Sequence, residues 1–206
     1  MKLYYAPGAC SIGIHVLLEE IGKPYQAEAV NFREGAQYKP PFTGVNPKSK
    51  VPTLERDDGS ILTEFPVIAR WLAMQNPQAA LIPQDQETDI RAMEVMEYCV
   101  GTIHAQGFTR LFRTERFAPS ASDHEAVKAA GRDAIEKGFA VVDKALAGKS
   151  YLGGNALSAA DAALFYVEFW AAKRVGMTLP PNCAAHFDRM MARPAVQRAL
   201  QQEGMN

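Results

Sequence analysis

Hydrophobic positions in the first eighty residues form short runs that alternate with turn signals. An apolar run at residues 2–6 predicts a strand, and the Pro7-Gly8 break ends it. Residues 11–21 repeat apolar side chains at helical spacing, which predicts a helix. These repeating positions are Ile14, Leu17, Leu18 and Ile21. Residues 25–30 alternate in the way that is typical of a second strand.

The pattern continues with a hairpin and a helix. Residues 53–56 and 60–62 predict two short strands, and the Asp-Asp-Gly sequence at 57–59 between them favours a hairpin turn. A proline begins the helix predicted at 66–74, where a missing N–H costs least. The first part of the chain is therefore predicted as β-α-β, an irregular segment at 31–46, and then β-β-α.

Beyond about residue 80, long segments with helical spacing replace the short runs. Residues 75–86 contain two prolines and several polar side chains, which indicates a linker. Helices are then predicted at about 87–117, 123–146, 158–174 and 184–200. Pro194 breaks the last of these. Ser158 and Asp161 have the spacing of a capping box at the start of the third.

Composition narrows the class of protein. The chain has 206 residues, 48% hydrophobic and 22% charged, with a net charge of −1, which is typical of a soluble globular protein. No basic patch favours nucleic acid, and no apolar run approaches the roughly 18 residues of a membrane-spanning helix. Its three cysteines are Cys10, Cys99 and Cys183. Their odd number and wide spacing argue against a disulfide framework or a zinc site, and we expect a reducing cytoplasm.

Cys10 is the cysteine whose position suggests chemistry. It lies at the first turn of the helix predicted at 11–21, where backbone N–H groups and the helix dipole favour the thiolate, so we predict a lowered pKa. The alternative is a small buried side chain with no chemical role, which we expect for Cys99 and Cys183. Gly13 occupies the position where a redox pair has its second cysteine. A lone thiol can hold a mixed disulfide or donate a hydrogen bond to a bound thiolate, but it cannot complete an intramolecular dithiol cycle.

Four motifs give the sequence a family resemblance over nearly its whole length. They are YYAPGACS at the first strand–helix turn, NPKSKVPTL before the hairpin, LTE before a helix, and LSAAD in a later helix. Together they resemble the cytosolic glutathione S-transferases, most closely the bacterial beta class, in which a Cys-Ser pair follows Pro-Gly-Ala. The resemblance implies an α/β thioredoxin-like N-terminal domain plus an all-α C-terminal helical domain, here at 1–77 and 88–206.

The resemblance also implies an enzyme. A glutathione transferase conjugates the thiol of its co-substrate glutathione to an electrophilic, hydrophobic substrate, and it needs no metal. The family usually forms homodimers in the cytoplasm and acts in detoxification. Neither nucleic acid nor a membrane is implied as a partner.

Individual residues carry implied roles in glutathione binding. Cys10 matches the thiol that contacts the glutathione sulfur, and Ser11 matches a candidate donor to that sulfur. Val51 and Pro52 match a Val-Pro step in which the proline is cis and the valine backbone pairs with the cysteinyl part of glutathione like an added strand. Glu64 matches the acid that binds the γ-glutamyl ammonium.

Further implied roles are less direct. His104 matches a beta-class histidine that approaches the thiol from across the domain cleft, as a proton acceptor or hydrogen-bond partner. With Phe108 and Phe112 it is expected to line the wall for the electrophile. Tyr5 matches an aromatic residue near the thiol and is equally compatible with the core. His15, one turn into the first helix, is expected to be structural.

The sequence departs from the family pattern in two places. Phe65 and Pro66 stand where a small residue, often serine, and a backbone N–H bind the γ-glutamyl carboxylate, although the Phe65 N–H remains. Losing a charge-assisted hydrogen bond costs about 1.5–3 kcal/mol, so glutathione affinity is expected to fall about tenfold or more. Ala105 replaces a lysine that often follows the helical histidine. Arg33 and Lys39 are alternative partners for the glycyl carboxylate.

Three other functions remain compatible with the residues. Cys10 could exchange disulfides with glutathione. The chain could be a non-catalytic binding or interaction protein on the same fold, which the departures at Phe65 and Ala105 favour. It could also be a dedicated glutathione-dependent dehalogenase or lyase.

Overall fold

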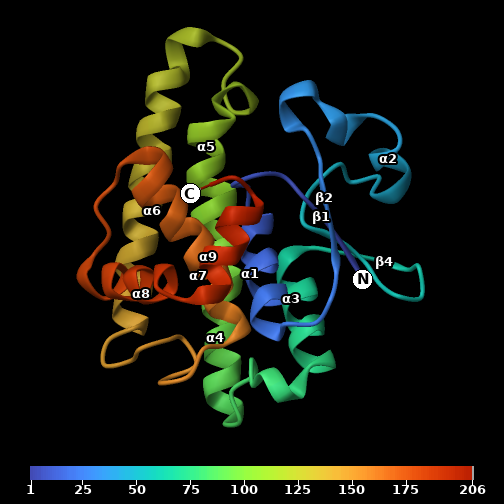
Figure 1. Cartoon of the computed structure of the whole chain (residues 1–206). Helices are drawn as coiled ribbons and strands as arrows, with labels where there is room; N and C mark the ends of the chain where they lie inside the picture. The colour runs from blue at the N-terminus through green and yellow to red at the C-terminus, as the bar shows by residue number, and fades with distance from the viewer. Residues whose placement is uncertain (206) are drawn as a thin grey trace. The chain divides into compact units, whose positions relative to one another are not determined.

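The computed structural model describes residues 1–205, which divide into two compact units (Figure 1). The first comprises Met1–Ile82 together with the chain from Asp188 onward, and the second comprises Pro83–Phe187. The C-terminal residues therefore pack with the N-terminal part of the chain. The domain bounds expected from the sequence, 1–77 and 88–206, stay a prediction.

A mixed four-stranded sheet forms the centre of the first unit. Its strands are β1 (Lys2–Tyr5), β2 (Gln26–Ala29), β3 (Thr53–Glu55) and β4 (Ile61–Thr63), in the order β2-β1-β3-β4. β1 pairs parallel with β2, while β1–β3 and β3–β4 are antiparallel. A parallel pair needs a crossover, which the helix between β1 and β2 supplies. The predicted β-α-β and β-β-α order, and with it the thioredoxin-like fold, is confirmed.

Two longer helices pack on this sheet, and shorter turns occupy the irregular segment. α1 (Ser11–Ile21) ends where Gly22 adopts a left-handed φ of 71° and donates its N–H to the Leu18 carbonyl, a typical C-terminal cap. α3 (Phe65–Gln75) has its proline in the first turn. The segment at 31–46 forms η1 (Phe32–Glu34), η2 (Ala36–Tyr38) and α2 (Phe42–Val45), and η3 (Pro77–Ala79) follows α3.

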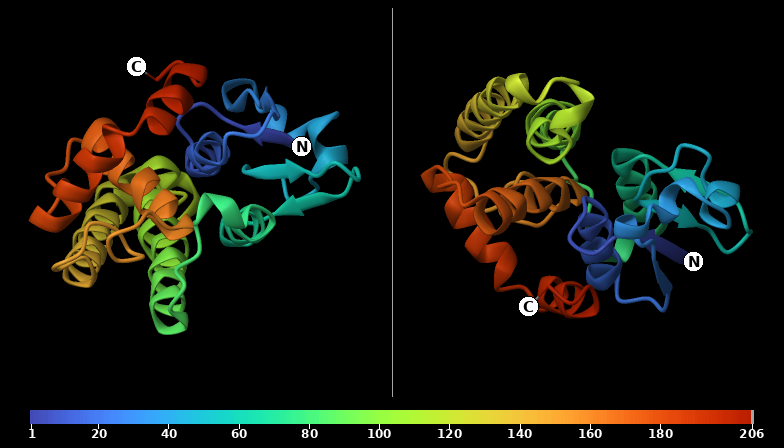
Figure 2. Two further views of the ribbon diagram at one scale, coloured as in Figure 1. Left: turned by 60° about the horizontal axis from the view of Figure 1, so that its bottom comes forward. Right: turned by 90° about the horizontal axis from the view of Figure 1, so that it is seen from above.

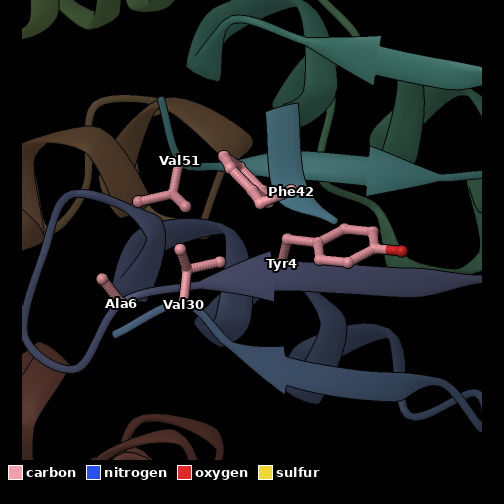
Figure 3. Close-up of a cluster of buried hydrophobic side chains, with 5 residues drawn as sticks. All are labelled: Tyr4, Ala6, Val30, Phe42 and Val51. Atoms are coloured by element: carbon pink, nitrogen blue, oxygen red, sulfur yellow. The ribbon is translucent and has the colours of Figure 1, made fainter. Parts of the chain in front are cut away.

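Side chains of β1 alternate between the two faces of the sheet. Tyr5 packs its ring 5.2 Å from the His15 ring of α1, so this face of the sheet is covered by α1. Tyr4 points to the opposite face and lies 5.8 Å, ring to ring, from Phe42 of α2. Figure 3 shows this second cluster, which comprises Tyr4, Ala6, Val30, Phe42 and Val51. The sheet is thus buried on both faces around β1.

The second unit is helical. Its elements are α4 (Gln86–Tyr98), η4 (Cys99–Phe108), α5 (Thr109–Phe112), η5 (Thr114–Arg116), η6 (Ala121–Asp123), α6 (His124–Ala145), α7 (Ala159–Phe169) and η7 (Trp170–Val175). η4 and η7 are wider π-type turns that continue α4 and α7. α8 (Pro181–Met191) leads from the second unit back to the first, where α9 (Pro194–Gln202) lies beside α1 (Figure 2). The all-helical second part is confirmed.

Close packing in the helical unit depends on glycines. α6 runs beside η4, and both views in Figure 2 show the two helices adjacent. A Cβ atom on Gly138 would lie 2.6 Å from Cγ1 of Ile103, and one on Gly107 would lie 2.5 Å from Cγ1 of Ile135. Real Cβ atoms do not approach so closely, so the two helix backbones can meet here only through glycine.

A buried ionic cluster lies in the core of the helical unit. Nδ1 of His186 is 2.8 Å from Oε2 of Glu168, and Nε2 is 3.1 Å from Oδ1 of Asp161. All three side chains are fully buried. Asp161 also accepts the backbone N–H of Ser158 at 2.7 Å, which confirms the predicted capping box at the start of α7. Among residues 1–205, no helix is both long enough and apolar enough to cross a membrane.

Candidate active site

A tight turn after β1 positions Cys10 at the start of α1. Gly8 has a φ of 65°, in the left-handed region that glycine adopts without strain. The Ala9 N–H then donates to the Ala6 carbonyl at 2.9 Å and closes the turn. Cys10 follows as the residue that caps α1, with helical backbone angles. The sequence PGAC therefore places the thiol at the helix start, as predicted.

The thiol of Cys10 contacts the loop that precedes β3. Its Sγ donates to the backbone carbonyl of Val51 at 3.3 Å. The Val51–Pro52 peptide bond is cis, as the resemblance implied. The structure thus brings together the two motifs that were expected to hold the cysteinyl part of glutathione, although they are about forty residues apart in the sequence.

The predicted lowering of the Cys10 pKa is wrong. Burial, with a smaller contribution from the Glu203 carboxylate, raises the pKa to about 12, although the backbone N–H groups of Cys10 and Ser11 and the charge of Lys50 act in the opposite direction. Part of the residue stays exposed, but protein atoms surround the sulfur. Desolvation therefore outweighs the helix N-terminus, and the thiol is held protonated. A protonated thiol is a hydrogen-bond donor and a poor nucleophile.

Two of the predicted residues near the thiol are engaged elsewhere. Ser11 is fully buried, and its hydroxyl accepts the Ala6 N–H at 3.2 Å and lies 3.4 Å from the Ala6 carbonyl. Tyr5 is buried against His15, and burial, followed by the charge of Glu203, raises its pKa. In this structure both side chains support the turn and α1, and their roles toward glutathione stay predictions.

Glu64 and Phe65 lie at the junction of β4 and α3. Glu64 has a φ of 69°, which is strained for a residue with a side chain, and its carboxylate is half exposed. Lys48 pairs with this carboxylate at 2.7 Å and also donates to Oγ1 of Thr63 at 2.9 Å. Phe65 begins α3 with its ring buried. The sequence analysis missed Lys48, although its place in the motif NPKSKVPTL was a usable signal.

One of the two candidate cations for the glycyl carboxylate has a backbone partner. The Lys39 ammonium donates to the Glu34 carbonyl at 2.8 Å, so it helps to fold the segment between η1 and α2.

Within residues 1–205, no group of three or more histidine, cysteine or acidic side chains could hold a metal ion.

His104 belongs to an aromatic cluster in the helical unit. Its Nδ1 lies 3.2 Å from the Tyr166 hydroxyl, and its ring meets the Trp170 ring edge-on at 4.8 Å. Phe108 is fully buried and stacks on the partly exposed Phe112 at 5.7 Å. The structure therefore brings the three residues predicted for the electrophile wall into one cluster. The sequence analysis missed Tyr166 and Trp170, which hold the histidine in place.

Comparison with known proteins identifies the family. The model described as glutathione S-transferase, N-terminal domain, matches residues 8–75, and the model for the C-terminal domain of the same family matches residues 125–189. Glutathione S-transferase GstA of Escherichia coli O157:H7 is 35% identical over 208 residues, which covers 100% of both chains.

Two solved structures agree with this assignment. A bacterial beta class glutathione S-transferase from Sphingomonas chungbukensis has a TM-score of 0.85 and 35% identity, with 100% of both chains covered. A sphingomonad glutathione S-transferase complexed with glutathione has the same TM-score, identity and coverage. The chain therefore belongs to the glutathione S-transferase family, and it is a transferase whose co-substrate is glutathione.

Proposed function

We propose that the chain binds glutathione on its first unit, beside Cys10, and conjugates the glutathione thiol to a hydrophobic electrophile. The observation that supports this best is the 3.3 Å contact between the Cys10 thiol and the Val51 carbonyl. It places a hydrogen-bond donor next to the loop on which the cysteinyl part of glutathione would pair like an added strand.

The other ends of glutathione would bind at the start of α3. The half-exposed Glu64 carboxylate is available for the γ-glutamyl ammonium, next to its present partner Lys48. The Phe65 N–H and the α3 N-terminus would bind the γ-glutamyl carboxylate, since helix N-termini favour anions. The side-chain hydroxyl that many relatives have at this position is absent, so we expect weaker binding than in those relatives.

We assign Cys10 the role of donor to the glutathione sulfur. Its protonated thiol would turn from the Val51 carbonyl to the bound sulfur and stabilise the thiolate, which raises the thiolate fraction about tenfold for each unit by which the pKa of glutathione falls. The thiolate then attacks the electrophile with its electron pair, a C–S bond forms, and the leaving group departs with the electrons of its bond. The proton of glutathione passes to solvent or to a base, for which His104 is the candidate.

A conjugation assay with three forms of Cys10 tests this role. We would measure the rate with glutathione and chlorodinitrobenzene for wild type, Cys10→Ser and Cys10→Ala, and use Cys183→Ala as the matched control, since Cys183 is buried in the helical unit. Loss of one such donor costs about 1.5–3 kcal/mol, so Cys10→Ala should lose at least about tenfold in rate. The serine hydroxyl should restore part of it. An alanine variant as fast as wild type would contradict the role.

Intact mass separates the donor role from disulfide exchange through Cys10. After incubation with oxidised glutathione, the raised pKa of Cys10 predicts slow or no adduct near neutral pH. A rapid adduct that disappears in Cys10→Ala and is reversed by reductant would instead support exchange. A wild type that passes through glutathione resin and has no turnover would support the non-catalytic alternative.

Three further proposals rest on the family resemblance. We propose a homodimer, a cytoplasmic location and a role in detoxification. Light scattering of the purified chain tests the first directly, because a dimer has twice the 22.6 kDa of one chain. Turnover of chlorodinitrobenzene compared with single halogenated aromatic compounds would separate a general transferase from a dedicated dehalogenase.

A further inference from the structure

Two helical segments of the helical unit face each other through three pairs of side chains, here called the aromatic ladder. The pairs are His104 with Tyr166, Phe108 with Trp170, and Phe112 with Arg174. Within each segment the members are four residues apart, so they lie on one side of their helix. The third pair differs from the other two, because a cation takes the place of the second ring.

The aromatic ladder runs from a buried pair to an exposed one. Phe108 and Trp170, the middle pair, are both buried, with their rings 5.4 Å apart. In the third pair, Cζ of Arg174 lies 5.5 Å from the centre of the Phe112 ring. The Phe112 ring is 39% exposed, and Arg174 is exposed as well. The open end of the ladder therefore presents a ring and a guanidinium side by side.

The backbone at the ladder is unusual in both segments. η4 (Cys99–Phe108) and η7 (Trp170–Val175) both depart from regular α-helical geometry into π-type turns. Such turns are rare in proteins and occur frequently at functional sites. Two of them on facing segments favour a ligand site at the ladder over a plain packing contact.

The third pair offers two kinds of contact to one ligand. An aromatic ligand packs on a protein ring with the ring centres about 4.5–7 Å apart. The Arg174 guanidinium lies at a similar distance from the Phe112 ring, so a ligand that packs on this ring is also near the guanidinium. The guanidinium is planar and permanently charged, and its N–H groups bind a carboxylate in a bidentate manner. A neutral hydrophobic ligand would use the ring alone.

We propose that Arg174 is a specificity-determining residue, which selects aromatic electrophiles that carry a carboxylate or another anionic group. The ring of the electrophile packs on Phe112, and its acidic group binds the guanidinium. The acidic group takes no part in bond making and serves to orient the ring. The proposal rests on the proposed function, because the ladder contains the residues expected to line the electrophile wall.

Quenching of Trp170 fluorescence tests the site without glutathione or turnover. Trp170 lies 5.5 Å, ring to ring, from Phe112, and a Trp71→Phe background leaves it as the only tryptophan. We would titrate the full chain with dinitrobenzoate and with neutral dinitrobenzene, two nitroaromatic quenchers that have no halide leaving group. The variants are Arg174→Gln, which removes the charge, and Arg174→Lys, which keeps it. Lys173→Gln is the matched control, because it removes the same charge from the neighbouring exposed residue.

We expect Arg174→Gln to raise the Kd of dinitrobenzoate by roughly threefold or more, the effect of one exposed ion pair, and to leave the Kd of dinitrobenzene unchanged. Lys173→Gln should keep both wild-type values. Arg174→Lys should lie between wild type and Arg174→Gln, because lysine retains the charge but not the planar fork. A wild-type ratio of the two Kd values in folded Arg174→Gln, or a wild type in which neither compound quenches Trp170, would overturn the proposal.

Turnover separates this proposal from the proposed function. We would measure kcat/KM with glutathione for neutral chlorodinitrobenzene and for chlorodinitrobenzoate, its acidic analogue. Arg174→Gln should lower kcat/KM for the acidic compound alone by roughly threefold or more, through KM. An equal effect on both compounds would overturn the selectivity and leave the transferase function in place. Turnover of neither compound would contradict the transferase function and the electrophile role, while quenching still measures whether Arg174 binds the acidic group.

Discussion

The buried cluster of His186, Asp161 and Glu168 predicts that the helical unit loses stability as the pH rises above neutral. Burial alone would lower the pKa of His186. The charge of Glu168 and the hydrogen bonds to Asp161 and Glu168 outweigh burial and raise the pKa from its ordinary 6.5 to about 10. The folded chain therefore keeps a proton on His186 over a pH range in which the unfolded chain has lost it.

The sign and size of the effect follow from linkage. A folded pKa above the unfolded one contributes stability in full below the unfolded value, and this contribution is lost as the pH rises through the folded value. Each unit of difference corresponds to about 1.4 kcal/mol, so the shift to about 10 amounts to about 5 kcal/mol in all. Between about pH 7 and about pH 8.5 the free energy of unfolding should fall by about 2 kcal/mol.

Urea unfolding at several pH values measures this fall. Trp71 and Trp170 are the two tryptophans, so a Trp71→Phe background makes fluorescence report on the helical unit alone. Glu168→Gln removes the charge that raises the pKa of His186 most, and it should flatten the slope of stability against pH. Asp133→Asn is the matched control, because its exposed carboxylate pairs with Lys137 on the surface of α6.

The slopes of stability against pH for wild type and Glu168→Gln test whether His186 holds the extra proton. Wild type and Asp133→Asn should lose stability in parallel as the pH rises, while Glu168→Gln starts lower and changes less. Equal slopes for wild type and Glu168→Gln would mean that His186 does not hold the extra proton. The range stops near pH 8.5 because the thiols of the unfolded chain begin to ionise above it.

Three further predictions concern packing, capping and glutathione binding. Gly138→Ala should destabilise the chain by about 1–3 kcal/mol in thermal unfolding, since its Cβ would lie 2.6 Å from Cγ1 of Ile103; an unchanged melting temperature would show that the helices can separate. Ser158→Ala should cost about 1 kcal/mol through loss of the α7 cap, and Ser158→Thr, which keeps the hydroxyl, should restore most of it. Glu64→Gln should weaken glutathione binding about tenfold in calorimetry with an unchanged melting temperature, and an equal Kd would exclude Glu64 as the ammonium partner.

Local sequence patterns predicted most of the fold, because most helices and strands are determined by signals within or next to their own residues. The helix predicted at 11–21 has the observed bounds, since its apolar spacing and Gly22 both lie within the segment. The helix predicted at 87–117 was too long, because the chain leaves helical geometry at Arg113, whose φ is −141°. The sequence analysis also gave no indication of the π-type turns of η4. The alternation at 25–30 did not correspond to burial, since all four residues of β2 are exposed at the edge of the sheet.

For the candidate site too, some features could be predicted from neighbouring residues and others depend on the three-dimensional fold. The place of Cys10 at a helix start is a local fact and was predicted correctly. The direction of its pKa was not, because desolvation depends on what packs around the sulfur in three dimensions. Glu203 could not have been found by spacing or motif, since it contacts Gly8 from 195 residues away along the chain.

The return of α9 to the first unit has a consequence for synthesis of the chain. Domains generally fold as units while the ribosome is still extending the chain. The helical unit is continuous from residue 83 to 187 and can be completed as soon as that stretch has emerged. The turn that carries the thiol is made first, yet Glu203, which contacts this turn through Gly8, follows the whole helical unit along the chain. The surroundings of the thiol are therefore completed only after the helical unit has been synthesised.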